Sequence, residues 1–344
     1  MWVCSVNVTG ISVLEIACDE SGYEGENLIG ATTEVFAHAS VRLPGESAAN
    51  CIQEIRRRIG SPATEYKSGH LLREKHRAVL EWLLGPSGPI HGNAHVYLID
   101  KTFFVVGKVI DLLVGEVAHA DGQDRRARAM AVTLYREGQR TFGREQWEVL
   151  LRSFNDLMRA RNRRGAGISV DSFFRMVDIL RRAGAGGRLD EIMGLLAQAR
   201  PHADAFRARL ADNPGMIPAL DPLIPAIVRA VVHWGQGSGP VSIVHDEHTT
   251  LTAERIAQLK KLFTSGQLAG MRLVDSRADP RVQVADFLAG VARKIASDEL
   301  NDRGDATLTA LLRPYVDGFS IWGDDRSWSL LRPEPSGQRD HLTW

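Results

Sequence analysis

Several apolar stretches of the chain run directly into an acidic residue. In the first of them, Val13–Cys18 precedes Asp19 and Glu20, and a short turn leads on to the apolar stretch Leu28–Phe36. A strand buried on both faces reads as a nearly continuous apolar run, so we predict two strands here that pair antiparallel. An acid at the carboxyl end of such a strand lies at the rim of the sheet, where the sites of α/β folds collect. The alternative, that both acids only open a solvated turn, stays open on this pattern alone.

The same pattern recurs further along the chain. The predicted strands Asn93–Asp100, Val241–Asp246 and Met271–Asp275 each end in an aspartate, and Ala39–Leu43 is a further short strand. Apolar positions at helical spacing predict helices between and after the strands, at Ser47–Ile59, Leu71–Leu84, Leu251–Thr264 and Val282–Ala296. Between the two strand-bearing ends, the pattern is helical from about Phe103 to Trp234.

The charge balance and the cysteines limit where the chain can act. Its 344 residues include 42 basic and 42 acidic ones, which give a formal net charge of zero. No field of the whole chain therefore draws it to nucleic acid or to a membrane, and any such surface has to be local. The three cysteines have no metal-binding spacing and cannot all pair, which indicates free thiols in a reducing cytoplasm. With no signal peptide and no membrane-spanning apolar run, we expect a cytoplasmic protein without a membrane partner.

One further acid lies inside a predicted helix. Within the segment VQVADFLAG, the neighbours of Asp286 are apolar at helical spacing, which places its carboxylate on or beside the buried face. A carboxylate is costly to desolvate there unless a cation, a metal or strong donors compensate its charge. The alternative is an aspartate at the edge of the apolar stripe that reaches water or an arginine.

Carboxylates gathered at one sheet edge suit Mg²⁺ or Mn²⁺, because both ions prefer hard oxygen ligands. Two such ions roughly 4 Å apart activate a water and stabilise the leaving oxygen in phosphodiester hydrolysis. Zinc fits less well, because Asp19, Asp275 and Asp286 have no histidine close to them in sequence. A mixed site with His245 and His248 stays open, although we favour loop residues or substrate contacts for them. The chain also lacks the phosphate loop, the dinucleotide fingerprint and the nucleophile elbow.

The helical block has one basic section. Residues 121–164 hold eleven arginines and six acids, a net charge of about +5. Such a surface suits contact with a phosphate backbone, and a solvated helical face with ion pairs between turns is the alternative. The arginines that we single out for nucleic-acid binding are Arg125, Arg126, Arg128, Arg161, Arg163 and Arg164.

Four motifs together resemble a known family. They are Asp19–Gly22 (DESG), Glu65–Gly69 (EYKSG), His245–Glu247 (HDE) and Val274–Gly290, which holds VDS and QVADFLAG. In order and spacing they resemble the DUF3800 family, a largely uncharacterised group of prokaryotic proteins thought to have an RNase H-like fold. The resemblance covers roughly residues 10–105 and 240–300. Members of this family are often suspected of roles in defence against phage or mobile elements.

The resemblance implies an α/β fold. It would consist of an RNase H-like core, a mixed sheet with flanking helices, interrupted by a large all-α insertion. We expect the core to comprise residues 1–105 and 239–300, the insertion residues 106–238, and a C-terminal tail residues 301–344.

The resemblance also implies a metal-dependent nuclease site. Asp19 on the first strand and Asp286 on the last helix would be metal ligands. In RNase H-like folds the first and fourth strands are neighbours, which favours Asp100 as a further member, whereas the family's DE pair after a later strand favours Asp246. Glu65 competes for the same position or orients the water, and Lys67 would contact the scissile phosphate or neutralise the acids. The expected catalytic residues are Asp19, Glu20, Glu65, Lys67, Asp100, Asp246 and Asp286, with Asp19, Asp246 and Asp286 as metal ligands.

We therefore expect a nuclease that hydrolyses phosphodiester bonds in DNA or RNA by a two-metal mechanism, with Mg²⁺ or Mn²⁺ as cofactor. The main alternative is a non-catalytic RNase H-like module that binds nucleic acid or a partner protein through the helical insertion. A phosphatase or nucleotide hydrolase that uses the same acids is a third. Assembly into a homo-oligomer stays open.

Overall fold

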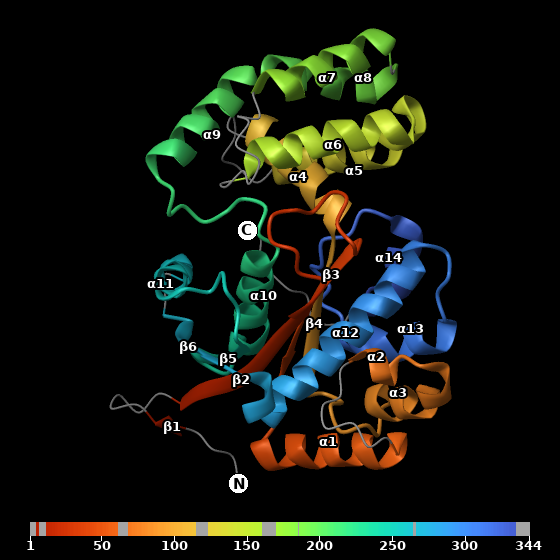
Figure 1. The fold of residues 1–344 in the computed structure, drawn as a ribbon, viewed down its shortest axis with the longest axis vertical. Coiled ribbons are helices and arrows are strands. Elements are labelled where there is room, and N and C mark those ends of the chain that lie inside the picture. Colours follow the sequence, from red (N-terminus) through yellow and green to blue (C-terminus); the bar gives the residue numbers. More distant parts are fainter. Residues whose placement is uncertain are drawn as a thin grey trace.

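A mixed sheet with helices on both faces forms the centre of the fold (Figure 1). The structure, a computed structural model, describes residues 5–6, 12–60, 68–114, 123–159, 170–184, 186–263 and 266–334. Its strands are β1 (Ser5–Val6), β2 (Ser12–Ser21), β3 (Val35–Val41), β4 (Ala94–Asp100), β5 (Val241–Asp246) and β6 (Leu268–Val274). The order across the sheet is β4–β3–β2–β5–β6, and the short β1 pairs with the beginning of β2.

β2 is the central strand and joins the two halves of the sheet. It pairs antiparallel with β3, which pairs antiparallel with β4, and it pairs parallel with β5, which pairs parallel with β6. Cys18 lies opposite His245 in the parallel ladder. Because β2 and β5 are parallel, Asp19 and Asp246, which follow this pair, lie at the same end of the two strands. The predicted α/β class, with a mixed sheet and flanking helices, is confirmed.

Consecutive residues of β2 point to opposite faces of the sheet, as the period of a strand requires. Ile16 and Cys18 are buried in the hydrophobic cluster on one face, and Ala17 is buried in the cluster on the other face. The side chain of Asp19 lies on the same face of the sheet as that of Ala17, and the side chain of Glu20 lies on the face of Cys18. The two adjacent acids therefore lie on opposite faces of the sheet.

The face shared by Ala17 and Asp19 is covered by four helices: α1 (Gly45–Ile59), α2 (Ser68–Leu71), α3 (Arg77–Leu84) and α12 (Pro280–Leu300). α12 packs directly on β2 and β3. Its start is fixed by Asp279, whose side chain accepts a 2.9 Å hydrogen bond from the backbone N–H of Arg281, and by Pro280 in the first turn. Val284, Phe287 and the other buried positions of α12 hold the helix against the sheet.

The opposite face carries α10 (Leu223–Gly235), and α11 (Ala253–Leu262) packs against β6. Above them in Figure 1 lies a block of helices: α4 (Lys101–Val114), α5 (Gln123–Phe142), α6 (Arg144–Met158), α7 (Val170–Ala183), α8 (Gly187–Gln198) and α9 (Arg200–Asp212). α10, which the predicted insertion 106–238 includes, packs against β2, β3, β4 and β5. One hydrophobic cluster runs from that face of the sheet into the helical block. No helix of the described residues is long and apolar enough to span a bilayer.

The two strands predicted at Leu28–Phe36 and Ala39–Leu43 are wrong, because a single strand, β3, takes up parts of both. Leu28 and Ile29 are buried, but in a loop before β3. Their backbone N–H groups donate to the side-chain oxygen of Asn155 on α6, at 2.9 and 3.1 Å, instead of to a strand. The buried side chains of Leu28 and Ile29 and these two hydrogen bonds therefore hold a loop against the helical block.

The C-terminal segment covers the edge of the sheet at β4. It includes α13 (Ala306–Leu312) and α14 (Asp325–Leu331). Between these helices, the backbone N–H groups of Asp317 and Ile321 donate to the carbonyl groups of Val96 and Leu98 on β4. An uncovered edge strand would present unpaired backbone groups, so this segment completes the sheet.

Candidate active site

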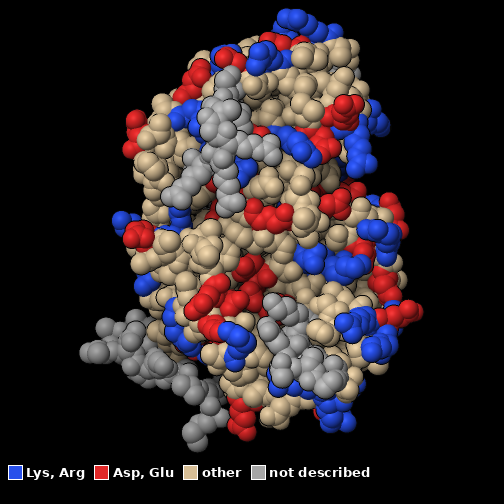
Figure 2. Space-filling model, in the orientation of Figure 1, with Lys and Arg blue, Asp and Glu red and all other residues tan. Residues whose placement is uncertain are grey.

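The candidate site is a carboxylate cluster, which we define as Asp19, Glu20, Asp246 and Asp286. Asp19 is buried on the face of β2 that packs against α12, and Asp286 lies partly exposed on α12. Asp246 ends β5 and continues the face of the buried Val244, which belongs to the same cluster of side chains as Ala17. In Figure 2, acidic side chains gather in the middle of the visible face, with basic side chains to their right.

The local structure fixes two of these carboxylates. Asp19 Oδ1 accepts a 2.7 Å hydrogen bond from the backbone N–H of Glu20, and Asp246 Oδ1 accepts a 2.9 Å hydrogen bond from the backbone N–H of Ser276. The second bond ties the end of β5 to the turn after β6. The charges of Asp246 and Asp286 both act on Asp19, although the three residues are far apart in the chain.

The acids of the cluster disfavour one another's charges. Burial raises the pKa of Asp19 well above its ordinary value, and the charges of Glu20, Asp286 and Asp246 raise it further. Burial also raises the pKa of Glu20 to about 8, with the charge of Asp246 as the next cause. A carboxyl group whose pKa lies that high keeps its proton at neutral pH unless a cation compensates the charge.

Two histidines lie beside Glu20. His248 Nε2 lies 3.3 Å from Glu20 Oε1, and His245 Nε2 lies 3.7 Å from Glu20 Oε2. Burial lowers the pKa of both, to about 4 for His245, so both are neutral at pH 7. His245 is a fully buried residue of β5, not a loop residue, and its ring stacks on that of His38.

The cluster offers carboxylate oxygens as ligands, but among the described residues only His95, His233 and Asp317 have ligand atoms that all lie within 4.8 Å of one another. Within the described part of the chain, no lysine or arginine forms an ion pair with Asp19, Glu20 or Asp246. His245 Nε2 and both ring nitrogens of His38 are buried without a hydrogen-bond partner among the described residues, on the face of the sheet that carries Glu20 and not on the face of Asp19. Hard oxygen ligands from two strands and a helix suit Mg²⁺ or Mn²⁺.

Sequence reasoning missed two members of this neighbourhood. Asp221, just before α10, is buried, and its side chain hydrogen-bonds with Tyr23 while its charge reaches Glu20. The Tyr23 ring packs edge-on against the His248 ring, with 4.4 Å between the ring centroids, and the Tyr23 hydroxyl lies 3.4 Å from Thr250 Oγ1. The only signal in the sequence was an Asp-Pro step before an apolar helix, which reads as a cap. Asp221 is indeed a cap, accepting from the backbone N–H of Leu223 at 3.0 Å.

Asp100 does not join the cluster. It ends β4, and β3 lies between β4 and β2 in the sheet. Its side chain accepts a 3.0 Å hydrogen bond from the backbone N–H of Phe103 at the start of α4 and interacts with Tyr135. Burial is the main reason that its pKa rises to about 6. We expected the strand that ends in Asp100 to be the fourth strand and to neighbour the first, and this is wrong. Because β3 replaces two predicted strands, β4 is the third strand counted from β2, and β5 is the fourth.

The other predicted residues lie elsewhere. Arg125, Arg126 and Arg128 are exposed on α5, in the helical block. Glu65 and Lys67 lie outside the described residues, as do Arg161, Arg163 and Arg164. Ser68, the first described residue after Lys67, packs against Gly290, one helical turn after Asp286.

A second group of possible metal ligands, His95, His233 and Asp317, lies at the edge of the sheet, with ligand atoms within 4.8 Å of one another. The Asp317 carboxylate already accepts hydrogen bonds from His95 Nε2 at 2.7 Å and from the guanidinium of Arg229. The two imidazole rings are stacked with their centroids 4.0 Å apart, so their in-plane lone pairs do not converge on one point. We assign this group a structural role, because its donors are satisfied and Arg229 already supplies the positive charge.

Comparison with protein-family models finds no matching family, and comparisons with curated proteins and with solved structures find no match either. The function of this chain is therefore argued from the geometry above.

Proposed function

We propose that this protein is a metal-dependent nuclease that hydrolyses phosphodiester bonds in DNA or RNA with two Mg²⁺ or Mn²⁺ ions. The observation that carries the proposal is the convergence of Asp19, Asp246 and Asp286 from β2, β5 and α12 at one end of the sheet. Asp19 and Asp246 have no lysine or arginine partner among the described residues. Burial and the neighbouring carboxylates raise the pKa of Asp19, and such a buried charge is expensive to maintain unless a cation compensates it.

The strand order supports an RNase H-like core. In that fold the first and fourth strands are neighbours, and here β2 and β5 stand in this relation when β2 is counted first. Of the two acids left open by the sequence, this order supports Asp246, because β5 pairs with β2 and β4 does not. The resemblance to the DUF3800 family and a role in defence against mobile elements remain part of the proposal, as does the helical block as an insertion.

The residues divide the work by their face of the sheet. Asp19, Asp246 and Asp286 would hold the ions on the α12 side, with Asp19 between the other two. Bound divalent ions would supply an activated water and stabilise the leaving oxygen. On the α10 side, Glu20 and His248 lie close enough to share a proton, and Tyr23 orients the His248 ring. Glu65 and Lys67 keep their proposed roles beside the reacting phosphate.

A cleavage assay tests the proposal. Purified protein is incubated with labelled single- and double-stranded DNA and RNA in Mn²⁺, Mg²⁺ or EDTA, beside its Asp19→Asn variant. We expect cleavage of at least one polymer that requires metal and falls at least 1,000-fold in the variant, on the order of the loss when an essential charged group is removed.

Asp275→Asn is the matched control. Asp275 directly follows β6 and is partly exposed, and Arg277 holds its pKa at about 2. This variant should cleave like the wild type. If no polymer is cleaved and Mn²⁺ does not raise the melting temperature, the nuclease is excluded. A non-catalytic module that binds nucleic acid or a protein through the helical block then becomes the better account.

A further inference from the structure

Arg293 differs from the other arginines near the carboxylate cluster. It lies on α12 seven residues after Asp286, which is nearly the same helix face and about 10 Å further along the axis. Arg281 and Arg277 form ion pairs with Asp279 and Asp275. The guanidinium of Arg293 instead donates from Nε to the hydroxyl of Ser21, at 2.9 Å.

The positive charge of Arg293 has no carboxylate within ion-pair distance among the described residues. Glu24 and Asp298 act on it only from further away, and each has a closer partner, Lys101 for Glu24 and Lys294 for Asp298. The side chain is half-buried, and burial lowers the pKa of its guanidinium. Of the five N–H donors of a guanidinium, the structure uses one on a neighbouring side chain. A half-buried guanidinium whose other donors have no partner among the described residues suits a phosphate, whose oxygens match it in shape and charge.

Ser21 places this fork beside the carboxylate cluster. Ser21 follows Asp19 by two residues on β2, and their register partners on β3, Ala37 and Ala39, are both buried on the α12 side. Two residues along a strand span about 7 Å and share one face. A nucleic-acid strand with one phosphate at Asp19 would therefore carry a neighbouring phosphate toward Arg293.

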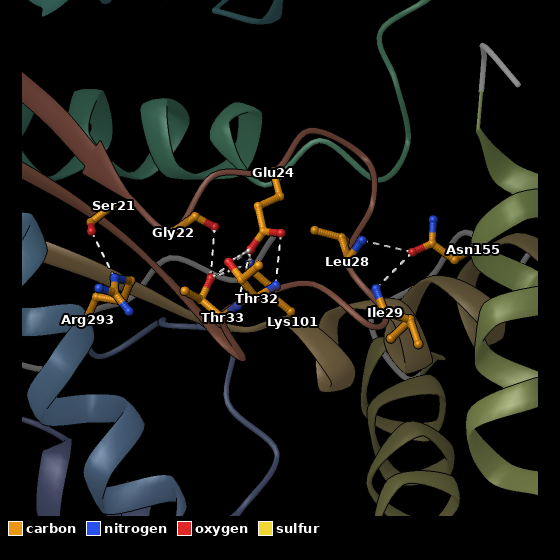
Figure 3. A network of polar contacts seen from close by, with 10 residues as sticks. All are labelled: Ser21, Gly22, Glu24, Leu28, Ile29, Thr32, Thr33, Lys101, Asn155 and Arg293. Carbon is orange, nitrogen blue, oxygen red and sulfur yellow. Dashed lines mark hydrogen bonds and ion pairs between the residues drawn. The ribbon is translucent and has the colours of Figure 1, made fainter. Parts of the chain in front are cut away.

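The position of Arg293 is fixed before any ligand arrives. Gly22, at a φ of 83°, leaves room for the Arg293 side chain: a Cβ there would lie 2.7 Å from Arg293 Cδ and 2.5 Å from the carbonyl oxygen of Val35. Figure 3 shows the loop that follows, in which Glu24 accepts hydrogen bonds from Thr32 and Thr33 and pairs with Lys101. The hydrogen bond to Ser21 and the packing beside Gly22 orient the Arg293 side chain.

We propose that Arg293, oriented by Ser21, binds the phosphate of a polynucleotide strand that neighbours the scissile phosphate. This inference rests on the proposed function, because it takes the carboxylate cluster as the place of cleavage. Arg293 acts in it as a residue that positions substrate and selects for a charged backbone.

The first experiment measures binding, in the Asp19→Asn background so that no substrate is consumed. Affinities for fluorescently labelled single-stranded DNA and RNA are measured in Mn²⁺ over a range of salt concentrations, with and without the Arg293→Gln change. We expect about tenfold weaker binding and a salt-dependence slope smaller by about 1, because one phosphate contact is lost. Lys294→Gln is the matched control, since it removes one charge from the next residue of the same helix, where Lys294 already pairs with Asp298. It should change the affinity less than threefold.

The second experiment measures cleavage of an oligonucleotide in which the linkage next to the scissile bond is a neutral methylphosphonate. Arg293→Gln should lower kcat/KM about tenfold on the natural strand and have little effect on the modified one. The subsite would be overturned if Arg293→Gln lowered kcat/KM equally on the natural and the modified oligonucleotide, or did not lower it at all. It would also be overturned if Lys294→Gln weakened binding as much as Arg293→Gln does. Binding that depends on Arg293 without any cleavage would reject the nuclease and keep the subsite, whereas a protein that binds neither polymer would reject both.

Discussion

Glu20 and His248 face each other at the end of the sheet, with 3.3 Å between Glu20 Oε1 and His248 Nε2. The contact joins the central strand to the turn after β5. Burial raises the pKa of Glu20 to about 8 and lowers that of His248, so a neutral carboxyl group facing a neutral imidazole is the stable form at pH 7 without metal. Glu20, which follows Asp19 in the chain, therefore changes its charge in the range in which enzymes usually work.

This pair predicts how stability depends on pH. The folded pKa of Glu20, about 8, lies above the ordinary value of 4.5, so the folded state binds a proton that the unfolded state has released. The stability that the protonated form of Glu20 contributes to the fold is fully present below about pH 4.5 and is lost as pH rises toward 8. In EDTA we expect the free energy of unfolding to fall between pH 5 and pH 8 by about 2–4 kcal/mol more in the wild type than in Glu20→Gln. Denaturant titrations at a series of pH values measure this difference.

The comparison with Glu20→Gln is needed because buried histidines act in the opposite direction. Burial lowers the pKa of His38 and His245, and such groups stabilise the fold as pH rises toward the ordinary value of 6.5. Their contribution is common to both proteins and cancels in the difference. Equal slopes for the two proteins would show that Glu20 keeps an ordinary pKa.

Asp19→Asn should raise thermal stability in the absence of metal. Asp19 is buried among like charges that raise its pKa, and a neutral amide of the same shape relieves that repulsion. We expect a melting temperature in EDTA that is unchanged or higher by about 1–2 °C, which corresponds to about 1 kcal/mol for a chain of this length. The same change should abolish the rise that Mn²⁺ causes in the wild type. A variant that is strongly destabilised in EDTA would instead give Asp19 a structural role.

The acids of the site were predictable where the sequence carries a local pattern. Asp19 and Asp246 follow apolar strands, and Asp286 interrupts the apolar stripe of a helix, so each could be recognised within about ten residues of sequence. The parallel pairing of β2 with β5 then brings the first two together. Asp221 could not be found in this way, because its cap to Leu223 is local but its contact with Tyr23 spans nearly two hundred residues.

Asp100 shows the opposite failure. Its local pattern, an apolar strand ending in an acid, is the same as that of Asp246, yet it caps α4 at the outer part of the sheet. The sequence predicts two strands between residues 28 and 43, whereas the structure has one, and the backbone N–H groups of Leu28 and Ile29 donate to Asn155 instead of to a strand. A hydrogen bond to so distant a residue leaves no trace in local periodicity.

Asn155→Ala tests how far the helical block supports the site. The change leaves the backbone N–H groups of Leu28 and Ile29 without an acceptor and removes the 2.6 Å bond to the carbonyl oxygen of Glu26. Buried groups left without partners predict a loss of about 2–4 kcal/mol in the free energy of unfolding. Thermal and denaturant unfolding measure it. The control is Asn213→Ala, at an exposed residue after α9, which should cost less than about 0.5 kcal/mol. Equal losses of stability in the two variants would show that Asn155 does not stabilise the loop.

Asp317→Asn separates a structural from a metal-binding role at the edge of the sheet. Burial favours the neutral form of Asp317, but the hydrogen bond from His95 and the charge of Arg229 hold its pKa at about 2. Removing that charge leaves Arg229 and His95 without their buried partner, so we expect a loss of about 3–5 kcal/mol. Titrating Zn²⁺ into the wild type should leave the melting temperature unchanged, and the rise caused by Mn²⁺ should persist in Asp317→Asn from its lower starting value. A wild-type rise with Zn²⁺ that disappears in Asp317→Asn would show instead that His95, His233 and Asp317 bind a metal ion, which requires Arg229 to leave the carboxylate that it holds in this structure.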